Sequence, residues 1–247
     1  MYDRQTDGIG FYQSHSEYRP FVGADFEKYR ILIIGESHYI GQSCGGSDNP
    51  YEIDYFMRNW FDGDCTELNA AYANWFNTQE VIHNYMNGNR RKGYLIFTNL
   101  AKSFSKTILG DEIGSISSES GRIFDYFAFM NFFQMPSLYS GKGFWDSLKL
   151  SAKRINRPEL AYQCWDTVVC KSVSVTDNVI DILAPRLTVF VSKSAYDAYM
   201  NCEKSKYKNE VKHCDHPACP WWNQKKSGGI MTGKEQFERV LKDCCGK

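Results

Sequence analysis

The sequence lacks the long apolar run that a membrane-spanning helix needs. No stretch approaches the roughly 20 consecutive apolar residues that cross a bilayer, and the segment Met1 to Gly10 has neither the cationic nor the apolar region of a signal peptide. An excess of charge is also missing, since the formal net charge is +0. That balance disfavours a strongly basic, sequence-blind coat for nucleic acid, although one local patch could still bind it. These absences predict a cytoplasmic protein with no membrane partner and no obligate protein partner.

The sequence has nine cysteines but no C-x-x-C pair. An odd number at irregular spacing does not suit a disulfide framework, and a cytoplasmic location predicts reduced thiols. Cys214 and Cys219 lie near His216 and could be interpreted as metal ligands. Pro217 and Pro220, however, restrict how that loop could wrap an ion. We therefore expect no metal and no cofactor.

The order of apolar segments predicts one α/β domain over residues 1–247. Of the residues, 43% are hydrophobic and 15% aromatic, which is ample for a core. Buried strands are expected at 31–34, 126–133 and 188–191. Helices are expected from 51 to 61, from 68 to 85, at 177–183, at 195–201 with Ser192 or Ser194 as its cap, and after a capping box at Thr232 and Glu235. Residues 1–29 should form an irregular arm, and 94–98 fits a strand or a helix. Strands that alternate with helices favour a largely parallel sheet.

Two segments far apart in the chain suggest a functional site. The first is the apolar run 31–34, which ends abruptly in glycine and polar side chains, as a buried parallel strand does when it leads into a site at its carboxyl end. These residues are Gly35, Glu36, Ser37, His38 and Tyr39. The second segment, residues 216–222, combines a histidine with two prolines and two tryptophans, and it fits neither a helix nor a strand.

Two polar residues in these segments, and one near the end of the second predicted strand, could take part in chemistry. His216 is suited to proton transfer or hydrogen bonding near neutral pH, although it could equally be a buried histidine satisfied by backbone. Glu36 could activate water or stabilise positive charge, or it could cap the next helix. Asn131, near the end of the second strand, offers the donor and acceptor that read an amide-like edge, or it could be structural. Loops at the carboxyl ends of parallel strands share one crevice.

The two tryptophans allow three interpretations. Trp221 and Trp222 could stack on bases, could wedge into a duplex, or could simply cover the core.

A serine hydrolase is an alternative that these residues allow us to test. Gly35, Glu36 and Ser37 begin like the G-x-S-x-G turn of such enzymes, with His216 as the downstream base. That sharp turn needs a small residue two places after the serine, and Tyr39 stands there. The sequence therefore disfavours a hydrolase that uses Ser37 and His216.

Four features in order resemble the uracil-DNA glycosylase superfamily. Residues 35–39 stand where the family has G-Q-D-P-Y-H, G-E-A-P-G or G-x-N-P-G, and Asn131 precedes a stretch that ends in Pro136. Residues 181–195 are similar to the family's unit of a helix, L-K-P-K, a strand and G-x-x-A. His216, Pro217 and Ala218 are similar to its late H-P-S or H-P-A motif. The resemblance covers about residues 31–240 and implies a three-layer α/β/α fold with a mostly parallel sheet of about four strands.

The resemblance implies excision of uracil or a related damaged base from single- or double-stranded DNA after base flipping. Asn131 would bind the edge of the base, and His216 would stabilise negative charge on the leaving base. Gly35, Glu36, Ser37, His38 and Tyr39 would line the pocket, with Tyr39 where some members exclude the thymine methyl. The family's DNA-probing loop would comprise Ala218, Trp221, Trp222, Asn223, Lys225 and Lys226.

The sequence departs from the family pattern at its first motif. Ser37 stands where an aspartate positions water in some members, and His38 replaces the motif proline. Glu36 matches the G-E-A-P-G branch, but the four cysteines that hold an iron–sulfur cluster in that branch have no counterpart, so no cluster is expected. Asn99 is a second candidate for the residue that reads the base. An inactive member that binds nucleic acid, a nucleotide or a free nucleobase is therefore the alternative function.

Overall fold

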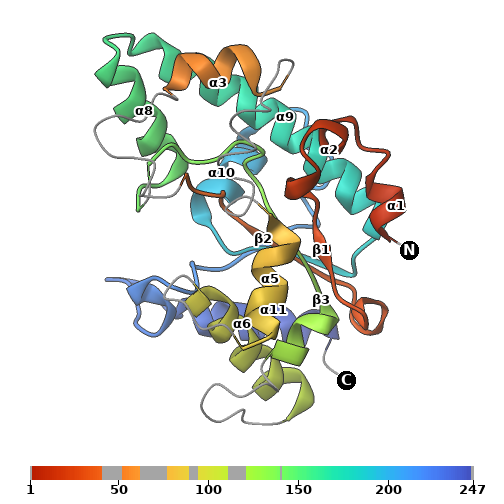
Figure 1. Cartoon of the computed structure of the whole chain (residues 1–247). Helices are drawn as coiled ribbons and strands as arrows, with labels where there is room; N and C mark the ends of the chain where they lie inside the picture. Colours follow the sequence, from red (N-terminus) through yellow and green to blue (C-terminus); the bar gives the residue numbers. More distant parts are fainter. Residues whose placement is uncertain are drawn as a thin grey trace.

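The computed structural model describes residues 2–40, 52–61, 77–88, 94–110, 121–139 and 141–245 (Figure 1). The strands are β1 (Phe21–Val22), β2 (Ile31–Gly35), β3 (Phe127–Asn131), β4 (Leu187–Phe190) and β5 (Lys212–His213). The α-helices are α1 (Tyr2–Thr6), α2 (Gly10–Ser14), α3 (Ile53–Asn59), α5 (Thr78–Met86), α6 (Leu95–Phe104), α8 (Phe144–Arg154), α9 (Glu159–Leu183), α10 (Lys193–Asn201) and α11 (Gly233–Cys245). Shorter helical turns are η1 (Ser16–Tyr18), η2 (Phe26–Lys28), η5 (Ser105–Leu109, a π-helix), η6 (Ile123–Tyr126) and η7 (Pro220–Trp222).

The strands form one mostly parallel sheet in the order β1-β3-β2-β4-β5. The central strand β2 pairs in parallel with β3 on one side and with β4 on the other, and β4 pairs in parallel with β5. Strand β1 is antiparallel to β3 at the edge. The predicted α/β class is therefore confirmed. Because four strands run in the same direction, their carboxyl ends meet at one edge of the sheet.

Alternate residues of β2 face opposite layers of helices. Leu32 and Ile34 are fully buried in a core formed with α3, α8, α9 and α10. Ile31 and Ile33 are fully buried in a second core formed with α5, α6 and α11. Successive side chains of a strand point to opposite faces of its sheet, so this run is apolar throughout because both faces are covered. The arrangement is consistent with three layers, with α3, α8 and α9 on one side of the sheet and α6 and α11 on the other (Figure 1).

The amino-terminal segment is more regular than we predicted. Instead of an irregular arm, it contains α1, α2 and the edge strand β1. Phe21 is buried and pairs with Phe129, and the Gly23 amide donates to the Phe127 carbonyl at 2.8 Å. A Cβ at Gly23 would clash with the Asp125 carbonyl, so glycine lets the two backbones approach this closely. Pairing with a distant strand is invisible to a local sequence pattern, which explains the wrong prediction.

The helix predicted at 177–183 is the last part of the 25-residue helix α9. It follows Pro158 and ends at Leu183. The next residue, Ala184, has a left-handed φ of 41° and comes directly before Pro185. The predicted stop was therefore correct, but the start lies much earlier than we expected. The ambiguous segment 94–98 belongs to α6, and the predicted helix over 68–85 corresponds to α5 from Thr78. Residues 68–76 of that prediction lie outside the described part.

The two predicted helix starts near the carboxyl terminus have the expected caps. The Thr232 amide donates to Glu235 Oε2 at 2.7 Å, and the Glu235 amide donates to Thr232 Oγ1 at 3.1 Å. Ser192 is the N-cap of α10, because its Oγ accepts from the Ala195 amide at 3.3 Å. Both caps satisfy amides that a helix leaves without partners in its first turn.

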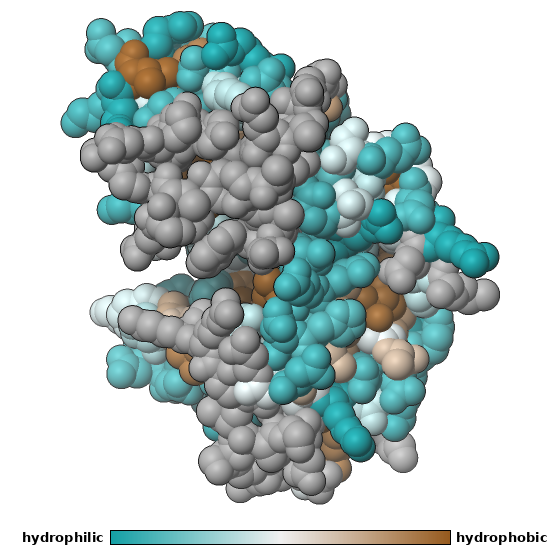
Figure 2. Space-filling model, viewed as in Figure 1, coloured by the Kyte–Doolittle hydropathy of each residue, from teal (hydrophilic) through white to brown (hydrophobic). Residues whose placement is uncertain are grey.

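Hydrophilic residues dominate the described surface in the view of Figure 2, which is hollowed on the left. That is the side on which Figure 1 shows the segment after β5, coloured blue. Within the described residues, no helix combines the length and the apolarity that crossing a bilayer requires.

A methyl group at Gly35 should disturb the carboxyl end of β2. Its Cβ would clash with Asn131 Oδ1 and lie 3.0 Å from Phe129 Cζ. We expect Gly35→Ala to lower the free energy of unfolding by about 1 kcal/mol, the low end of the usual cost of overpacking, because the atoms in the way belong to side chains and not to the backbone. Urea denaturation measures the change. Gly10→Ala is the matched control, because no atom lies within 4 Å of a Cβ there. Equal stability of the two variants would contradict the close packing of Asn131 on Gly35.

Candidate functional site

Asn131 places an unpaired amide at the carboxyl edge of the sheet. It is the last residue of β3 and pairs in register with Gly35, the last residue of β2. Because Gly35 has no side chain, the Asn131 amide can lie against it. The main-chain carbonyl of Asn131 accepts from Gln134 Nε2 at 2.6 Å, but its side-chain amide has no hydrogen bond to any described residue. One donor group and one acceptor therefore remain available to a ligand.

Glu36 is held by donors from two other elements. Its Oε1 accepts from the Phe144 amide at the start of α8, at 2.8 Å, and its Oε2 accepts from the Ser192 hydroxyl at 3.0 Å. Glu36 thus serves an amide in the first turn of α8, a helix far along the chain, and not the helix that follows it in sequence as the alternative expected. Ser192 follows β4 as Glu36 follows β2, so parallel pairing brings these residues together. The carboxylate is fixed and half-buried at the same edge as Asn131.

His216 presents a neutral imidazole with a defined tautomer. Its Nδ1 accepts from the Ala218 amide at 3.2 Å. In a neutral ring the proton must then reside on Nε2, which becomes a hydrogen-bond donor. Burial lowers the pKa of His216, and the negative charge of nearby Glu36 opposes this change. At neutral pH the residue is therefore an uncharged donor, and its electrostatic contact with Glu36 places it near the carboxyl end of β2.

The loop that carries His216 is fastened from both sides. The Asn99 Nδ2 on α6 donates to the Pro217 carbonyl at 2.6 Å. Just before the loop, the Asp215 amide donates to Gln236 Oε1 of α11 at 3.0 Å. The Asp215 carboxylate pairs with Lys226, which closes the segment on itself. Apart from the exposed Lys226, these contacts involve buried or half-buried groups, so they limit the positions that the imidazole can take.

Residues 37–39 point in different directions. His38 is buried, with its Nε2 3.0 Å from Thr78 Oγ1 and its ring 4.7 Å from that of Tyr18. Burial lowers the pKa of His38 to about 3. Tyr39 is 39% exposed and forms a bridge with Ser137. His38 thus contacts the interior, whereas Tyr39 is open to a ligand.

The contact that a serine hydrolase requires is missing from the described residues. Ser37 is buried, and no hydrogen bond joins its hydroxyl to His216. Nucleophile and base normally lie within hydrogen-bonding reach of each other. The structure thus adds no support to the hydrolase alternative.

The adjacent tryptophans occupy different environments. Trp222 is only 2% exposed and packs against Phe237, with ring centroids 6.1 Å apart. Trp221 is 41% exposed. Of the other predicted contacts with nucleic acid, Ala218, Asn223, Lys225 and Lys226 are exposed. Because a side chain in the core cannot stack on a base, only Trp221 of the pair is available for that role.

Sequence reasoning missed two residues of this region. Ser192 was considered only as a helix cap, although its place directly after a parallel strand was a signal that it would reach the edge with Glu36. Ile230 is 86% exposed on the segment that follows His216. A large apolar residue in a stretch rich in lysine, serine and glycine was a signal for a surface contact.

The fold and these groups define an α/β protein with a polar site at the carboxyl edge of a parallel sheet. The side chains of the described residues include no group of three or more His, Cys, Asp or Glu that could hold a metal ion. Comparisons with protein-family models, with curated proteins and with solved structures found no match to this chain. Any assignment of function must therefore rest on the geometry of the site and on the motifs in the sequence.

Proposed function

We propose that this chain is a DNA glycosylase of the uracil-DNA glycosylase type, which hydrolyses the N-glycosidic bond of a flipped-out base. One observation carries the proposal. The free amide of Asn131, the fixed carboxylate of Glu36 and the Nε2 donor of His216 belong to segments that end or follow parallel strands of one sheet. In the proposal the amide reads the edge of the base, the carboxylate stabilises positive charge on the sugar, and the imidazole stabilises the leaving base. Cleavage of a glycosidic bond needs these three functions.

Asn131 supplies recognition in this proposal. Uracil presents a carbonyl oxygen and an N–H side by side, and an asparagine amide can donate to the first and accept from the second. A half-buried amide without a partner among the described residues favours a ligand that satisfies both groups, because a polar group that stays unsatisfied when it is desolvated costs about 1–3 kcal/mol. A base without this pattern would leave the amide unsatisfied, so the same contact provides discrimination.

His216 supplies stabilisation of the leaving base. As the bond to the sugar breaks, its electrons move onto the base, and negative charge grows on a carbonyl oxygen. A neutral imidazole with its proton on Nε2 can donate to that oxygen without a prior charge of its own. The amide of Ala218 keeps the other nitrogen occupied as an acceptor. The loop contacts of Asn99 and Asp215 hold the donor in place before the reaction.

Glu36 supplies the negative charge that the sugar needs. Loss of the base leaves positive charge on the sugar ring, and a nearby carboxylate stabilises it. The Phe144 amide and the Ser192 hydroxyl orient both carboxylate oxygens, so little reorganisation is needed when the charge develops. In the proposal Glu36 also orients the attacking water, since Ser37 stands where some members of the family have an aspartate.

Contact with DNA is assigned to the exposed side chains after His216. Trp221 offers a ring for stacking, and Asn223 and Lys225 lie on the same exposed stretch near where phosphates would pass. Lys226 contributes less net charge because it pairs with Asp215. Trp222 is excluded from the interface by its burial.

Incubation with uracil-containing single- and double-stranded oligonucleotides tests this function. We expect alkali-labile abasic sites at the uracil positions and no other change in the strand. Asn131→Leu should lower kcat/KM by at least about tenfold, because at least one hydrogen bond worth 1.4 kcal/mol or more is lost. Asn178→Leu is the matched control, since Asn178 is exposed on α9.

Three outcomes separate the alternatives. Oligonucleotide binding without abasic sites, across uracil, hypoxanthine and xanthine substrates, would assign the inactive binding member of the fold. Cleavage that Asn131→Leu leaves unchanged would remove Asn131 from recognition, and Asn99 would then be the residue to test. If the protein neither binds nor cleaves these oligonucleotides, the proposed function is rejected.

A further inference from the structure

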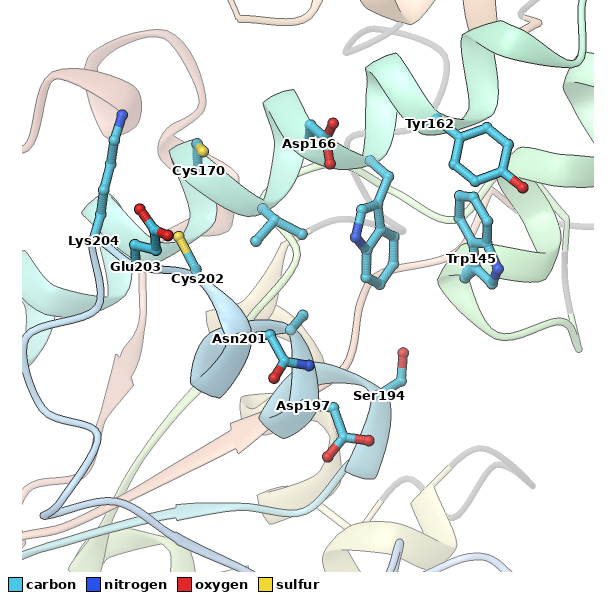
Figure 3. Close-up of a pocket in the computed structure, with 13 residues that line it drawn as sticks. Trp145, Tyr162, Asp166, Cys170, Ser194, Asp197, Asn201, Cys202, Glu203 and Lys204 are labelled. Atoms are coloured by element: carbon cyan, nitrogen blue, oxygen red, sulfur yellow. The ribbon is translucent and has the colours of Figure 1, made fainter.

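A large open cavity lies away from Asn131, between the helices that cover one face of the sheet. It has a volume of about 990 Å³ and is bounded by α8, α9 and α10 (Figure 3). Trp145, Tyr162 and Trp165 form one part of its wall. Cys170 and Cys202 lie together toward the other end, near Lys204 (Figure 3). The cavity thus exposes one thiol on α9 and one directly after α10 to molecules that enter it.

The helices that carry these thiols are held in register. On α9, the buried Asp177 accepts from the Tyr199 hydroxyl of α10 at 2.6 Å and from the Lys206 amide at 3.2 Å. Cys170 precedes Asp177 by seven residues, or two helical turns, and so shares its face of α9. Cys202 follows Tyr199 by three residues at the end of α10. Anchors on both sides therefore turn the two cysteines toward each other across the junction.

The two thiols already interact. Burial raises the pKa of Cys170, and the neighbouring Cys202 thiol raises it further through charge and hydrogen bonding, against the opposing effect of Lys204. Both thiols are free and half-buried. By contrast, Cys164 and Cys214 are enclosed in the two cores. Cys170 and Cys202 therefore combine proximity to a second thiol with access from a cavity.

We propose that Cys170 and Cys202 are a redox modification site, at which a small disulfide such as oxidised glutathione converts them to a protein disulfide. One cysteine thiolate attacks the glutathione disulfide, forms a mixed disulfide and releases one glutathione thiolate. The second cysteine thiolate then attacks the protein sulfur and releases the second glutathione. The two cysteines lose two electrons and two protons, which the reagent gains as two thiols.

The new bond would join α9 to α10 next to the site already described. The N-cap of α10 is Ser192, whose hydroxyl binds Glu36. Oxidation therefore restrains the helix that orients the carboxylate. The chemistry of the thiols does not depend on the proposed glycosylase function, so the two proposals can fail separately.

Thiol counting by mass spectrometry tests this site. The native protein is equilibrated with oxidised glutathione, denatured, alkylated with N-ethylmaleimide and weighed intact. We expect two of the nine cysteines to escape alkylation without retained glutathione, and peptide mapping to join Cys170 to Cys202. Oxidation should be faster at pH 8.5 than at pH 7, because a raised thiol pKa leaves little thiolate at neutral pH. Dithiothreitol should reverse the change.

Single substitutions complete the test. Cys202→Ser should leave Cys170 with bound glutathione and no internal cross-link, whereas Cys244→Ser, at a half-buried cysteine on α11, should oxidise as the wild type does. Thermal melting of the reduced variants checks that each one folds. Alkylation of all nine cysteines in the wild type, or a cross-link joining another pair such as Cys214 and Cys219, would overturn the proposal.

Discussion

Replacement of His216 by alanine should lower the rate of uracil excision about 10²–10³-fold, which corresponds to about 2.7–4 kcal/mol of lost transition-state stabilisation. The reason is the donor on Nε2. The Ala218 amide occupies Nδ1, so the proton lies on Nε2, and in the proposed mechanism it donates to the leaving base. Single-turnover kinetics with a uracil-containing oligonucleotide measure the loss, and they separate the chemical step from product release.

Controls for this variant distinguish chemistry from structure. His83→Ala removes an exposed histidine of α5 and should leave excision unchanged. The affinity of His216→Ala for the oligonucleotide should change far less than its rate, because the lost hydrogen bond strengthens only in the transition state. An excision rate equal to that of the wild type would remove His216 from the mechanism. A loss of rate together with a loss of thermal stability would show that the loop has collapsed.

Acidification should destabilise the fold through His38. The unfolded chain takes up a proton near the ordinary histidine pKa of about 6.5, but burial lowers the folded-state pKa of His38 to about 3. Between these values the unfolded state binds a proton that the folded state does not, so the free energy of unfolding falls as pH decreases. The expected slope from this group is about 1.4 kcal/mol per pH unit, which accumulates to about 4–5 kcal/mol near pH 3. Above pH 6.5 the free energy of unfolding no longer changes with pH through His38, because neither state binds the proton.

A comparison of slopes isolates His38 from the other titrating groups. Urea denaturation is measured from pH 7 to pH 4 for the wild type and for His38→Gln, which keeps a polar side chain near Thr78. The variant should lose stability more slowly with falling pH, whatever its stability at pH 7, because the carboxylates and the remaining histidines are common to both proteins. Identical slopes would show that the folded protein accommodates the charged imidazole.

The central strand and the helix caps could be predicted because their signals are local. Residues 31–34 form an apolar run that ends in Gly35, and the structure places β2 there, buried on both faces. The caps at Ser192 and at Thr232 depend on side chains within three residues of the amides that they satisfy. Such signals survive in any tertiary context, because the contacts are complete within a few residues of chain.

The partners of the candidate site could not be predicted in the same way. Sequence patterns placed Glu36, Asn131 and His216 in loops or at strand ends, but they did not show that Glu36 binds Ser192 or that Asn99 holds the His216 loop. These contacts join residues that are more than 100 positions apart. Their formation depends on strand order and on helix packing, which many sequences with similar local patterns can arrange differently.

Adjacent residues of similar type differ in burial, and the sequence does not show which of them is buried. Trp221 and Trp222 are identical residues side by side, and His38 and Tyr39 are both polar residues after a strand. Only the packing of η7 against α11 puts Trp222 in the core and leaves Trp221 exposed. Only the contacts with Tyr18 and Thr78 make His38 an interior residue.

The sequence by itself determined the α/β class, the course of the central strand, the helix caps and the residue types able to do chemistry, since each follows from local periodicity or local hydrogen bonding. The tertiary structure alone decided the pairing of β1, the length of α9, the orientation of Glu36 and the placement of Cys170 and Cys202 on one cavity. These features depend on long-range contacts, whose free energy is realised only when the sheet and both helical layers have assembled.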